Sequence, residues 1–249
     1  MREKITSRHN PLLAHFKKLL TVRAYRAERR EFAADGVKLL AEAVRWGCPL
    51  TAVLVQEGVT LPEVPAGVRV AEVSADIMRS VSLMEAPQGA LFACRMPEDA
   101  PAEVTPGCVV LDGIQDPGNL GTILRTADAL DVPVILTEGC ADAYNPKVVR
   151  ASMGAVLRTP PRGLKKADVV RACREQGVQL LATAMSADAR DVRSAALLQA
   201  ATVIGSEGRG VCPELLEAAD GKVIIPMSAR CESLNAAVAA TIVMWQMKR

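Results

Sequence analysis

One stretch decides the fold: Lys222-Val-Ile-Ile-Pro-Met-Ser-Ala-Arg-Cys-Glu-Ser-Leu-Asn-Ala-Ala-Val-Ala-Ala-Thr-Ile-Val-Met-Trp245. Its first apolar residues predict a short buried strand, which ends at Pro226 because proline has no N–H to donate to a sheet ladder. A polar loop follows, and Ser233 stands where a helix N-cap is expected. Apolar residues then recur at helical spacing on one face: Val238, Ile242 and Trp245. This unit of strand, loop and helix offers unpaired backbone N–H groups to a polar ligand, and a plain connection in an α/β core is the alternative.

The composition is that of a folded protein with an aliphatic core. The 249 residues exceed the usual size of one domain, so we expect two domains or one large domain. Half of the residues are hydrophobic but only 3% are aromatic, which leaves Ala, Val, Leu and Ile to fill the core. No apolar segment approaches the roughly 20 residues of a membrane span, and residues 1–10 lack the apolar region of a signal peptide. We therefore expect a cytoplasmic protein without a membrane segment.

The seven cysteines are scattered, with no Cys-x-x-Cys pair and one left over from any even pairing. This pattern is typical of small buried residues in a reducing compartment, and it indicates no metal site. Cys231 lies in the last loop and is the one cysteine whose position suggests catalysis. The only histidines, His9 and His15, are far away in sequence, which disfavours that interpretation.

Positive charge is concentrated near the N-terminal end, although the whole chain carries only +2. Residues 1–31 hold nine Lys or Arg against three Glu, a net charge of +6, which leaves −4 on the remainder. Basic helices can neutralise phosphates and so bind nucleic acid without sequence preference, while a solvated helix face is the alternative. The candidate RNA-binding residues are Arg8, Lys17, Lys18, Arg23 and Arg26.

Hydrophobic periodicity divides the chain into an N-terminal α/β domain at residues 1–96 and a second domain at 107–249. The linker expected between them, 97–106, holds three prolines and three acids. In the first domain we predict a helix over 12–20, a second helix through Glu31, helices 37–46 and 75–84, and strands 32–34, 50–56, 69–73 and 89–95. In the second we predict strands 108–111, 134–136, 179–182, 201–204 and 223–225, and helices 119–130, 146–155, 165–176, 213–219 and 234–245. Such alternation predicts a mostly parallel sheet covered on both faces.

The loop that opens the second domain reads Asp112-Gly-Ile-Gln-Asp-Pro-Gly-Asn-Leu-Gly-Thr-Ile-Leu-Arg125. Its glycines allow tight backbone paths beside a ligand. Asn119, Thr122 and Arg125 follow at positions i, i+3 and i+6, near one another on one side of the predicted helix. An arginine at this place can hold a phosphate or a carboxylate bidentately, and a surface salt bridge is the alternative.

A second glycine-rich loop, Gly205-Ser-Glu-Gly-Arg-Gly210, follows another predicted strand. It lacks the Gly-x-x-x-x-Gly-Lys-Ser/Thr pattern of a phosphate-binding loop, and its glycines stand in the reverse of the dinucleotide-binding order. The Glu207 carboxylate would also repel a pyrophosphate. The loop therefore disfavours nucleotide-dependent hydride or phosphoryl transfer.

Three segments carry a resemblance to a known family: Asn119-Leu-Gly-Thr-Ile-Leu-Arg125, Gly205-Ser-Glu-Gly-Arg-Gly210, and Ile225-Pro-Met227 with Ser233-Leu-Asn235. In order and spacing they resemble the three motifs of the SpoU (TrmH-like) RNA ribose methyltransferases of the SPOUT superfamily. Residues 1–96 resemble, more weakly, the family's substrate-binding extension, which has a ribosomal-protein-like α/β fold. The resemblance implies a deep trefoil knot in the C-terminal SPOUT domain and a homodimer.

The resemblance also implies an S-adenosylmethionine-dependent transfer to a ribose 2′-hydroxyl, without a metal. Arg125 matches the catalytic arginine, Asn119 its motif partner, and Glu207 a carboxylate with a positioning role. A guanidinium is always protonated, so we expect Arg125 to clamp the target phosphate and stabilise oxyanion charge. The implied cofactor-binding residues are Thr183, Ile204, Gly205, Ile225, Pro226, Ser233, Leu234 and Asn235.

The sequence leaves the RNA partner and two other functions open. The N-terminal domain and its basic helices favour a large structured target, ribosomal RNA rather than transfer RNA. Base methylation is one alternative, because related knotted enzymes modify nucleobase nitrogens. The other is a non-catalytic RNA-binding or ribosome-assembly factor, which the presence of Arg125 and Asn235 disfavours.

Overall fold

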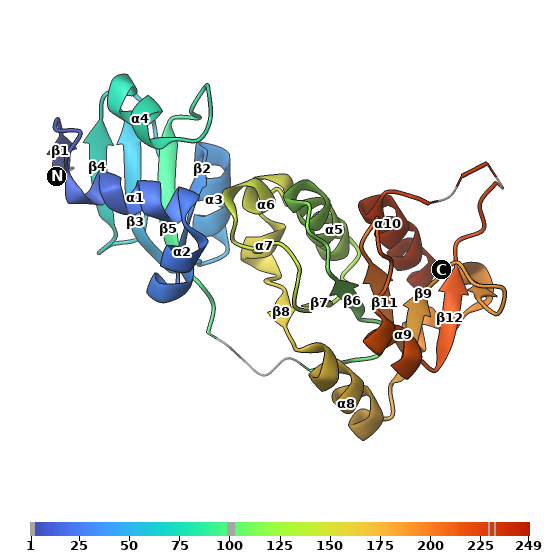
Figure 1. Ribbon diagram of the computed structural model, residues 1–249. Coiled ribbons are helices and arrows are strands. Elements are labelled where there is room, and N and C mark those ends of the chain that lie inside the picture. The colour runs from blue at the N-terminus through green and yellow to red at the C-terminus, as the bar shows by residue number, and fades with distance from the viewer. Residues whose placement is uncertain (1–2, 99–102, 229, 232) are drawn as a thin grey trace. The chain divides into compact units, whose positions relative to one another are not determined.

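The computed structural model describes residues 3–98, 103–228, 230–231 and 233–249, which group into two compact units (Figure 1). The first unit is Met1–Glu98 with Tyr144–Arg158, and the second is Asp99–Ala143 with Thr159–Arg249. Residues 1–2, residues 99–102 of the predicted linker, and residues 229 and 232 of the predicted last loop lie outside the described residues. The domain boundaries expected from the sequence stay a prediction, and Tyr144–Arg158 groups with the first unit.

A five-stranded sheet forms the core of the first unit, in the order β1-β4-β3-β5-β2. β5 runs antiparallel to both of its neighbours, and the other pairs are parallel. The strands are β1 (Glu3–Ile5), which the sequence analysis missed, β2 (Glu31–Asp35), β3 (Leu50–Gln56), β4 (Arg69–Val73) and β5 (Ala90–Arg95). The helices of residues 3–98 are α1 (Pro11–Thr21), α2 (Arg23–Arg29), α3 (Val37–Arg45) and α4 (Ala75–Val81).

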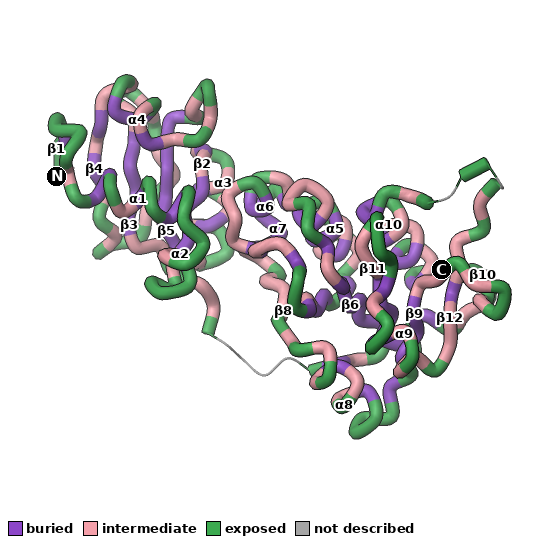
Figure 2. The backbone as a smooth tube through the Cα atoms, viewed as in Figure 1, coloured by how far each residue is buried: buried purple, intermediate pink, exposed green. Residues whose placement is uncertain are grey.

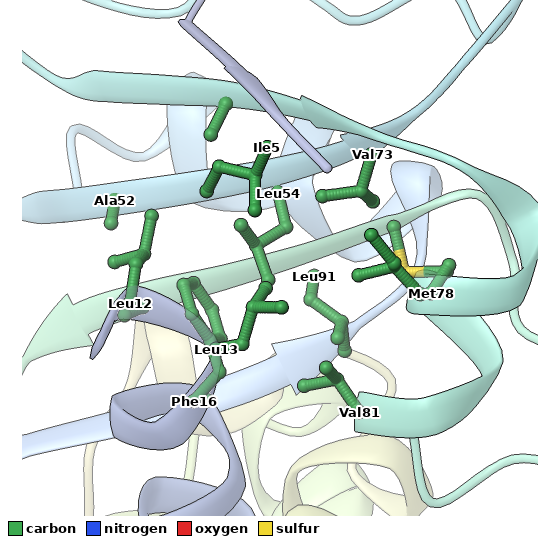
Figure 3. Close-up of a cluster of buried hydrophobic side chains, with 14 of the residues drawn as sticks. Ile5, Leu12, Leu13, Phe16, Ala52, Leu54, Val73, Met78, Val81 and Leu91 are labelled. Carbon is green, nitrogen blue, oxygen red and sulfur yellow. The ribbon is translucent and has the colours of Figure 1, made fainter. Parts of the chain in front are cut away.

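Helix α1 lies on one face of this sheet because its apolar residues share one side. Leu12 and Phe16 are buried there and belong to one cluster with Leu54 and Leu91 of the strands (Figure 3). The Asn10 side chain caps α1 by accepting a hydrogen bond from the backbone N–H of Leu12 at 2.8 Å. The other side of the helix is exposed (Figure 2) and carries its basic residues.

The segment Tyr144–Arg158 contains a broken helix rather than the single helix predicted at 146–155. α6 (Pro146–Ala151) ends and α7 (Ala155–Arg158) begins around Met153 and Gly154, whose φ angles of 51° and 85° are left-handed. The segment packs within the first unit. The ring of Tyr144 lies 4.8 Å from that of Phe32, measured between centroids.

A seven-stranded sheet forms the second unit, in the order β10-β12-β9-β11-β6-β7-β8. Among the described residues, every strand pair of this second sheet is parallel, which confirms the predicted α/β architecture. α8 and α9 cover one face, and α5 and α10 lie on the other (Figure 1). The strands are β6 (Val109–Asp112), β7 (Val134–Leu136), β8 (Arg162–Gly163), β9 (Gln179–Thr183), β10 (Arg190–Asp191), β11 (Ala200–Gly205) and β12 (Gly221–Ile224). The helices are α5 (Pro117–Ala129), α8 (Lys166–Gln176), α9 (Pro213–Ala218), α10 (Ala236–Met247) and two 3₁₀ turns, Val192–Ser194 and Leu197–Gln199.

Helix α10 packs on α5 through small and aliphatic side chains. Thr241 Oγ1 lies 3.4 Å from Thr126 Oγ1 of α5, and Ala240 and Met244 are buried. Of the three residues whose spacing predicted the helix, Val238 and Trp245 point outward, with exposed fractions of 47% and 58%, and Ile242 is half-buried. The helix is confirmed, while its predicted apolar stripe lies outside the core of this unit.

The buried cysteines behave as small apolar residues. Cys94, Cys108, Cys140 and Cys173 are buried, and none of the seven forms a disulfide among the residues described. Burial raises the pKa of the Cys108 thiol to about 12 and that of Cys173 to about 11, so both stay protonated at neutral pH. In the part of the chain that the structure covers, no helix has the length and apolar character that crossing a membrane requires.

Candidate active site

The carboxyl ends of three neighbouring strands meet at one edge of the seven-stranded sheet. β9, β11 and β12 end at Thr183, Gly205 and Ile224, and β9 lies between the other two. In open parallel sheets, ligands bind outside the carboxyl ends of the strands. The loops that follow these strands, together with the start of α10, line a cavity of about 290 Å³.

Six of the eight positions expected to bind a cofactor line this cavity: Thr183, Ile204, Gly205, Ile225, Ser233 and Leu234. Pro226 and Asn235 are not among its lining residues. Glu207 is, which places the expected positioning carboxylate at the same site. Nine further residues line it that were not named as site residues from the sequence: Ala184, Met185, Ser206, Gly210, Val223, Ile224, Met227, Ala236 and Ala239. Most of them lie within or directly beside the motif segments, which was the only available signal, because small and apolar side chains carry no chemistry that marks a site.

The loop after β11 closes on itself directly beside the cavity. Ser206 and Gly210 exchange two backbone hydrogen bonds, of 3.2 Å and 2.9 Å. A Cβ atom at Gly205 would lie 2.0 Å from the carbonyl carbon of Gly210, so no side chain fits there. At Gly208, by contrast, a Cβ atom would meet nothing within 4 Å. Close backbone approach is therefore the reason for a glycine at position 205.

A chain of side-chain hydrogen bonds joins the starts of two helices and one loop beside the cavity. Asn119 Nδ2 donates to the Glu207 carboxylate, and Asn119 Oδ1 accepts from Asn235 Nδ2 at 3.0 Å. Asn235 Oδ1 accepts from the backbone N–H of Ala237 at 2.9 Å and so caps α10. The predicted N-cap at Ser233 is therefore wrong, because asparagine caps equally well and stands two positions later. The chain connects the starts of α5 and α10 with the loop after β11.

Arg125 lies on α5 beyond the residues that open this helix. The Asp116 side chain caps α5, accepting from the Asn119 N–H at 2.8 Å. Arg125 itself is exposed. It makes no hydrogen bond or ion pair with any residue that the structure describes, so the salt bridge considered as an alternative is not seen there. Its guanidinium is thus available to an anionic ligand.

Asp112 anchors the end of the loop that follows β11, from inside the sheet. It is buried at the end of β6, in register with Gly205, and its Oδ2 accepts from the Cys212 N–H at 2.7 Å. Its Oδ1 accepts from Thr137 Oγ1 at 3.0 Å and lies 3.1 Å from Lys166 Nζ. Burial alone would raise the pKa of Asp112, but the hydrogen bonds from Cys212, Lys166 and Thr137 outweigh it and hold the pKa below its ordinary value. The ionised carboxylate thus ties the loop to β7 and α8.

Arg26 differs in its surroundings from the other cations expected to bind RNA. Arg26, expected to bind RNA, is only 3% exposed, and its Nη1 donates to the Leu19 carbonyl at 2.8 Å. That expectation is wrong because α2 turns back on α1 and buries the guanidinium. The other expected cations, Arg8, Lys17, Lys18 and Arg23, are exposed. Cys231 is exposed, and its thiol donates to the Ser233 carbonyl at 3.3 Å.

The models of two known families match successive parts of the chain. The model of the SpoU rRNA methylase family matches residues 106–245, and that of the MRM3-like substrate binding domain matches residues 10–92. With the parallel sheet and the cavity at its strand ends, these matches define a SPOUT methyltransferase with an N-terminal substrate-binding domain. The chain belongs to the SpoU rRNA methylase family.

Several relatives are similar over nearly their whole length. The 23S rRNA (guanosine(2553)-2′-O)-methyltransferase RlmP of Bacillus subtilis is 32% identical over 248 residues, which cover 99% of each chain. The solved structure of an AdoMet-bound rRNA methyltransferase from Sinorhizobium meliloti has a TM-score of 0.87 at 29% identity, covering 99% of this chain and 97% of that one. The SpoU methyltransferase AviRb from Streptomyces viridochromogenes, in complex with AdoMet, has a TM-score of 0.81 at 29% identity, covering 96% and 97%. In the residues described here, no three His, Cys, Asp or Glu are grouped so that they could hold a metal ion.

Proposed function

We propose that this protein transfers the methyl group of S-adenosylmethionine to a ribose 2′-hydroxyl of ribosomal RNA, with 23S rRNA as its substrate. The observation that carries the proposal is the hydrogen-bond chain Glu207–Asn119–Asn235, which joins three motif segments beside one cavity. The relative from Bacillus subtilis, named for 2′-O methylation of 23S rRNA, supports the substrate. The AdoMet-bound neighbours support the cofactor.

The cavity walls fit an adenosine. Ile204, Ile225 and Leu234 offer apolar surface for the two faces of adenine, and backbone groups at the strand ends and at the start of α10 can pair with its polar edges. Gly205 lets the backbone come close. When bound, S-adenosylmethionine supplies an electrophilic methyl group on a sulfonium. The carboxylate of Glu207 at the cavity wall is held by Asn119 and is placed to position the bound groups.

Arg125 is proposed as the catalytic residue on the RNA side. Its exposed guanidinium would clamp a phosphate next to the target ribose and stabilise negative charge that develops on the 2′-oxygen. Holding that oxygen in line with the methyl group supplies much of the rate. Since a guanidinium stays protonated, the proton of the hydroxyl leaves to phosphate or water.

The test is methyl incorporation from labelled S-adenosylmethionine into a 23S rRNA transcript by the full-length protein. The expected product is a labelled dinucleotide that resists alkaline cleavage, because a 2′-O-methyl group blocks attack by the 2′-oxygen on its own phosphate. Label in an alkali-sensitive nucleotide would identify a base methyltransferase. Binding of the RNA without incorporation would identify the non-catalytic alternative.

We further propose a homodimer formed through the outward face of α10. Val238 and Trp245 are 47% and 58% exposed on this face, and large apolar side chains gathered on one exposed helix face are typical of an interface. We also propose that the second domain contains a deep trefoil knot and that the protein acts on ribosomal RNA in the cytoplasm, as the family implies. The division into domains at 1–96 and 107–249 is retained, supported by the matched ranges 10–92 and 106–245.

A further inference from the structure

Tyr25 of α2 orders two cations at the surface of the first unit. Lys18 Nζ lies 5.3 Å and Arg29 Cζ 5.5 Å from the centroid of its ring, within range of a cation–π interaction. The Tyr25 hydroxyl is 2.9 Å from His15 Nδ1, and His15 Nε2 is 3.0 Å from Glu31 Oε2. Because the carboxylate accepts from Nε2–H, the Nδ1 of a neutral His15 accepts the hydrogen bond of the Tyr25 hydroxyl. The Tyr25 ring is thus held in place through its hydroxyl, and the two cations flank this ring.

Arg29 also lines an adjacent cavity of about 430 Å³. The other residues of this cavity are Arg30, Glu31, Arg95, Met96 and Glu98, so three arginines face two carboxylates. The Glu31 carboxylate contacts His15, and Arg30 Nη2 donates to the Pro97 carbonyl at 2.6 Å. Arg95 is exposed and, like Arg29, has no ion pair with any described residue. Lys18, Tyr25, Arg29 and Arg95 therefore form one continuous surface, which we call the Tyr25 surface.

We infer that the Tyr25 surface binds the phosphate backbone of the substrate RNA, with Lys18, Arg29 and Arg95 as the phosphate contacts. Unpaired cations on a rigid support are the usual source of affinity for nucleic acid, and an arginine fork suits a phosphate. Lys18, Tyr25 and Arg29 belong to the part of the chain matched by a substrate-binding domain, residues 10–92. The choice of RNA rests on the proposed function. Of these residues only Lys18 is among the candidate RNA-binding residues named from the sequence; the roles of Tyr25, Arg29 and Arg95 come from the structure.

The test compares binding of a 23S rRNA transcript by the full-length protein and its variants, without cofactor, over a series of KCl concentrations. Arg29→Gln and Arg95→Gln each remove one phosphate contact. Each is expected to raise Kd about fivefold near physiological salt and to reduce the slope of log K against log salt by about 0.7 to 0.9. Arg29→Lys keeps the charge but not the fork, so it is expected to keep the salt slope of the wild type and to have a Kd between those of the wild type and Arg29→Gln. Arg45→Gln is the matched control, since this arginine of α3 is 74% exposed and loses the same charge.

An unchanged Kd and salt slope in both Arg29→Gln and Arg95→Gln would overturn the inference. So would an equal loss in Arg45→Gln, because it would mean that net charge alone matters. Equal unfolding midpoints of the variants exclude misfolding as the cause. Methylation at saturating RNA separates this inference from the proposed function: if no protein methylates RNA but the two glutamine variants still bind more weakly, the surface stands and the proposed activity falls.

Discussion

The side-chain amide of Asn235 donates to the side-chain oxygen of Asn119 at 3.0 Å, across 116 residues of sequence. Asn235 is at the same time the N-cap of α10, and Asn119 also holds Glu207. One hydrogen-bond chain therefore sets the relative positions of a helix start, a glycine-rich loop and a second helix start. The cavity lies where these segments meet, so these hydrogen bonds control the geometry of the site as well as the stability of α10.

Asn119→Asp is expected to lower kcat about 10- to 100-fold with little change in cofactor affinity. A carboxylate has nearly the same shape but cannot donate to Glu207, and it places two negative charges in contact. Asn119 does not line the cavity, so binding of S-adenosylmethionine should stay within about threefold by calorimetry. Asn145→Asp, at the N-cap of α6, is the control, because its side-chain oxygen still accepts from the Lys147 N–H. A wild-type kcat in Asn119→Asp would contradict the role given to this chain.

Gly205→Ala is expected to weaken cofactor binding at least tenfold and to lower the free energy of unfolding by about 2 kcal/mol or more. The added methyl group meets backbone atoms of Gly210 at 2.0 Å, so the loop has to open beside the cavity. Gly208→Ala introduces the same methyl group where nothing lies within 4 Å and should leave both quantities unchanged. Calorimetric titration measures the cofactor affinity of the two variants, and urea unfolding measures their free energy of unfolding. Equal behaviour of the two variants would show that the loop is not closed as described.

Asp112→Asn is expected to destabilise the protein by about 2 to 4 kcal/mol at neutral pH, since it leaves Lys166 without its buried partner. The folded pKa of Asp112 lies below its ordinary value, so the stabilisation by the carboxylate is fully present above the unfolded pKa of about 3.9 and is lost as the pH falls through the folded pKa. The difference in unfolding free energy between wild type and variant should be constant from about pH 5 to 7 and shrink below about pH 4. A difference that grows in acid would contradict this sign.

Trp245→Glu is expected to convert a dimer into a monomer in sedimentation experiments. The Trp245 side chain is 58% exposed on the outward face of α10, where a charge would oppose burial in an interface. Leu83→Glu is the control, because Leu83 is similarly exposed, at 57%, but belongs to the first unit. A wild-type protein that sediments as a monomer at micromolar concentration would contradict the proposed interface.

Local sequence was sufficient for most elements of the fold. The predicted strands at 50–56 and 69–73 coincide with β3 and β4, because apolar and β-branched residues between polar flanks determine a buried strand locally. The predicted helix at 12–20 lies within α1 for the same kind of reason, since its apolar face and the Asn10 cap are both local. The three motif segments also told which loops would meet at the ends of the strands.

Features decided by distant contacts could not be predicted in this way. Ser233 and Asn235 are equally good N-caps, and the contact of Asn235 with Asn119 accompanies the choice. Arg26 had the pattern of a surface cation, but the turn between α1 and α2 buries it against the Leu19 carbonyl. The stripe through Trp245 has the spacing of a core face and lies outward, because the small residues on the other side of α10 allow closer packing on α5.

The most direct test of the account is to measure turnover and cofactor binding separately in Arg125→Ala. The guanidinium is exposed, has no partner among the described residues and does not line the cavity, so its removal should leave the fold and the binding of S-adenosylmethionine intact. We expect methyl transfer to 23S rRNA to fall at least about 100-fold while the Kd of the cofactor stays within about twofold. Loss of both quantities together, or retention of turnover, would contradict the claim that this arginine acts on the RNA beside a separately built cofactor site.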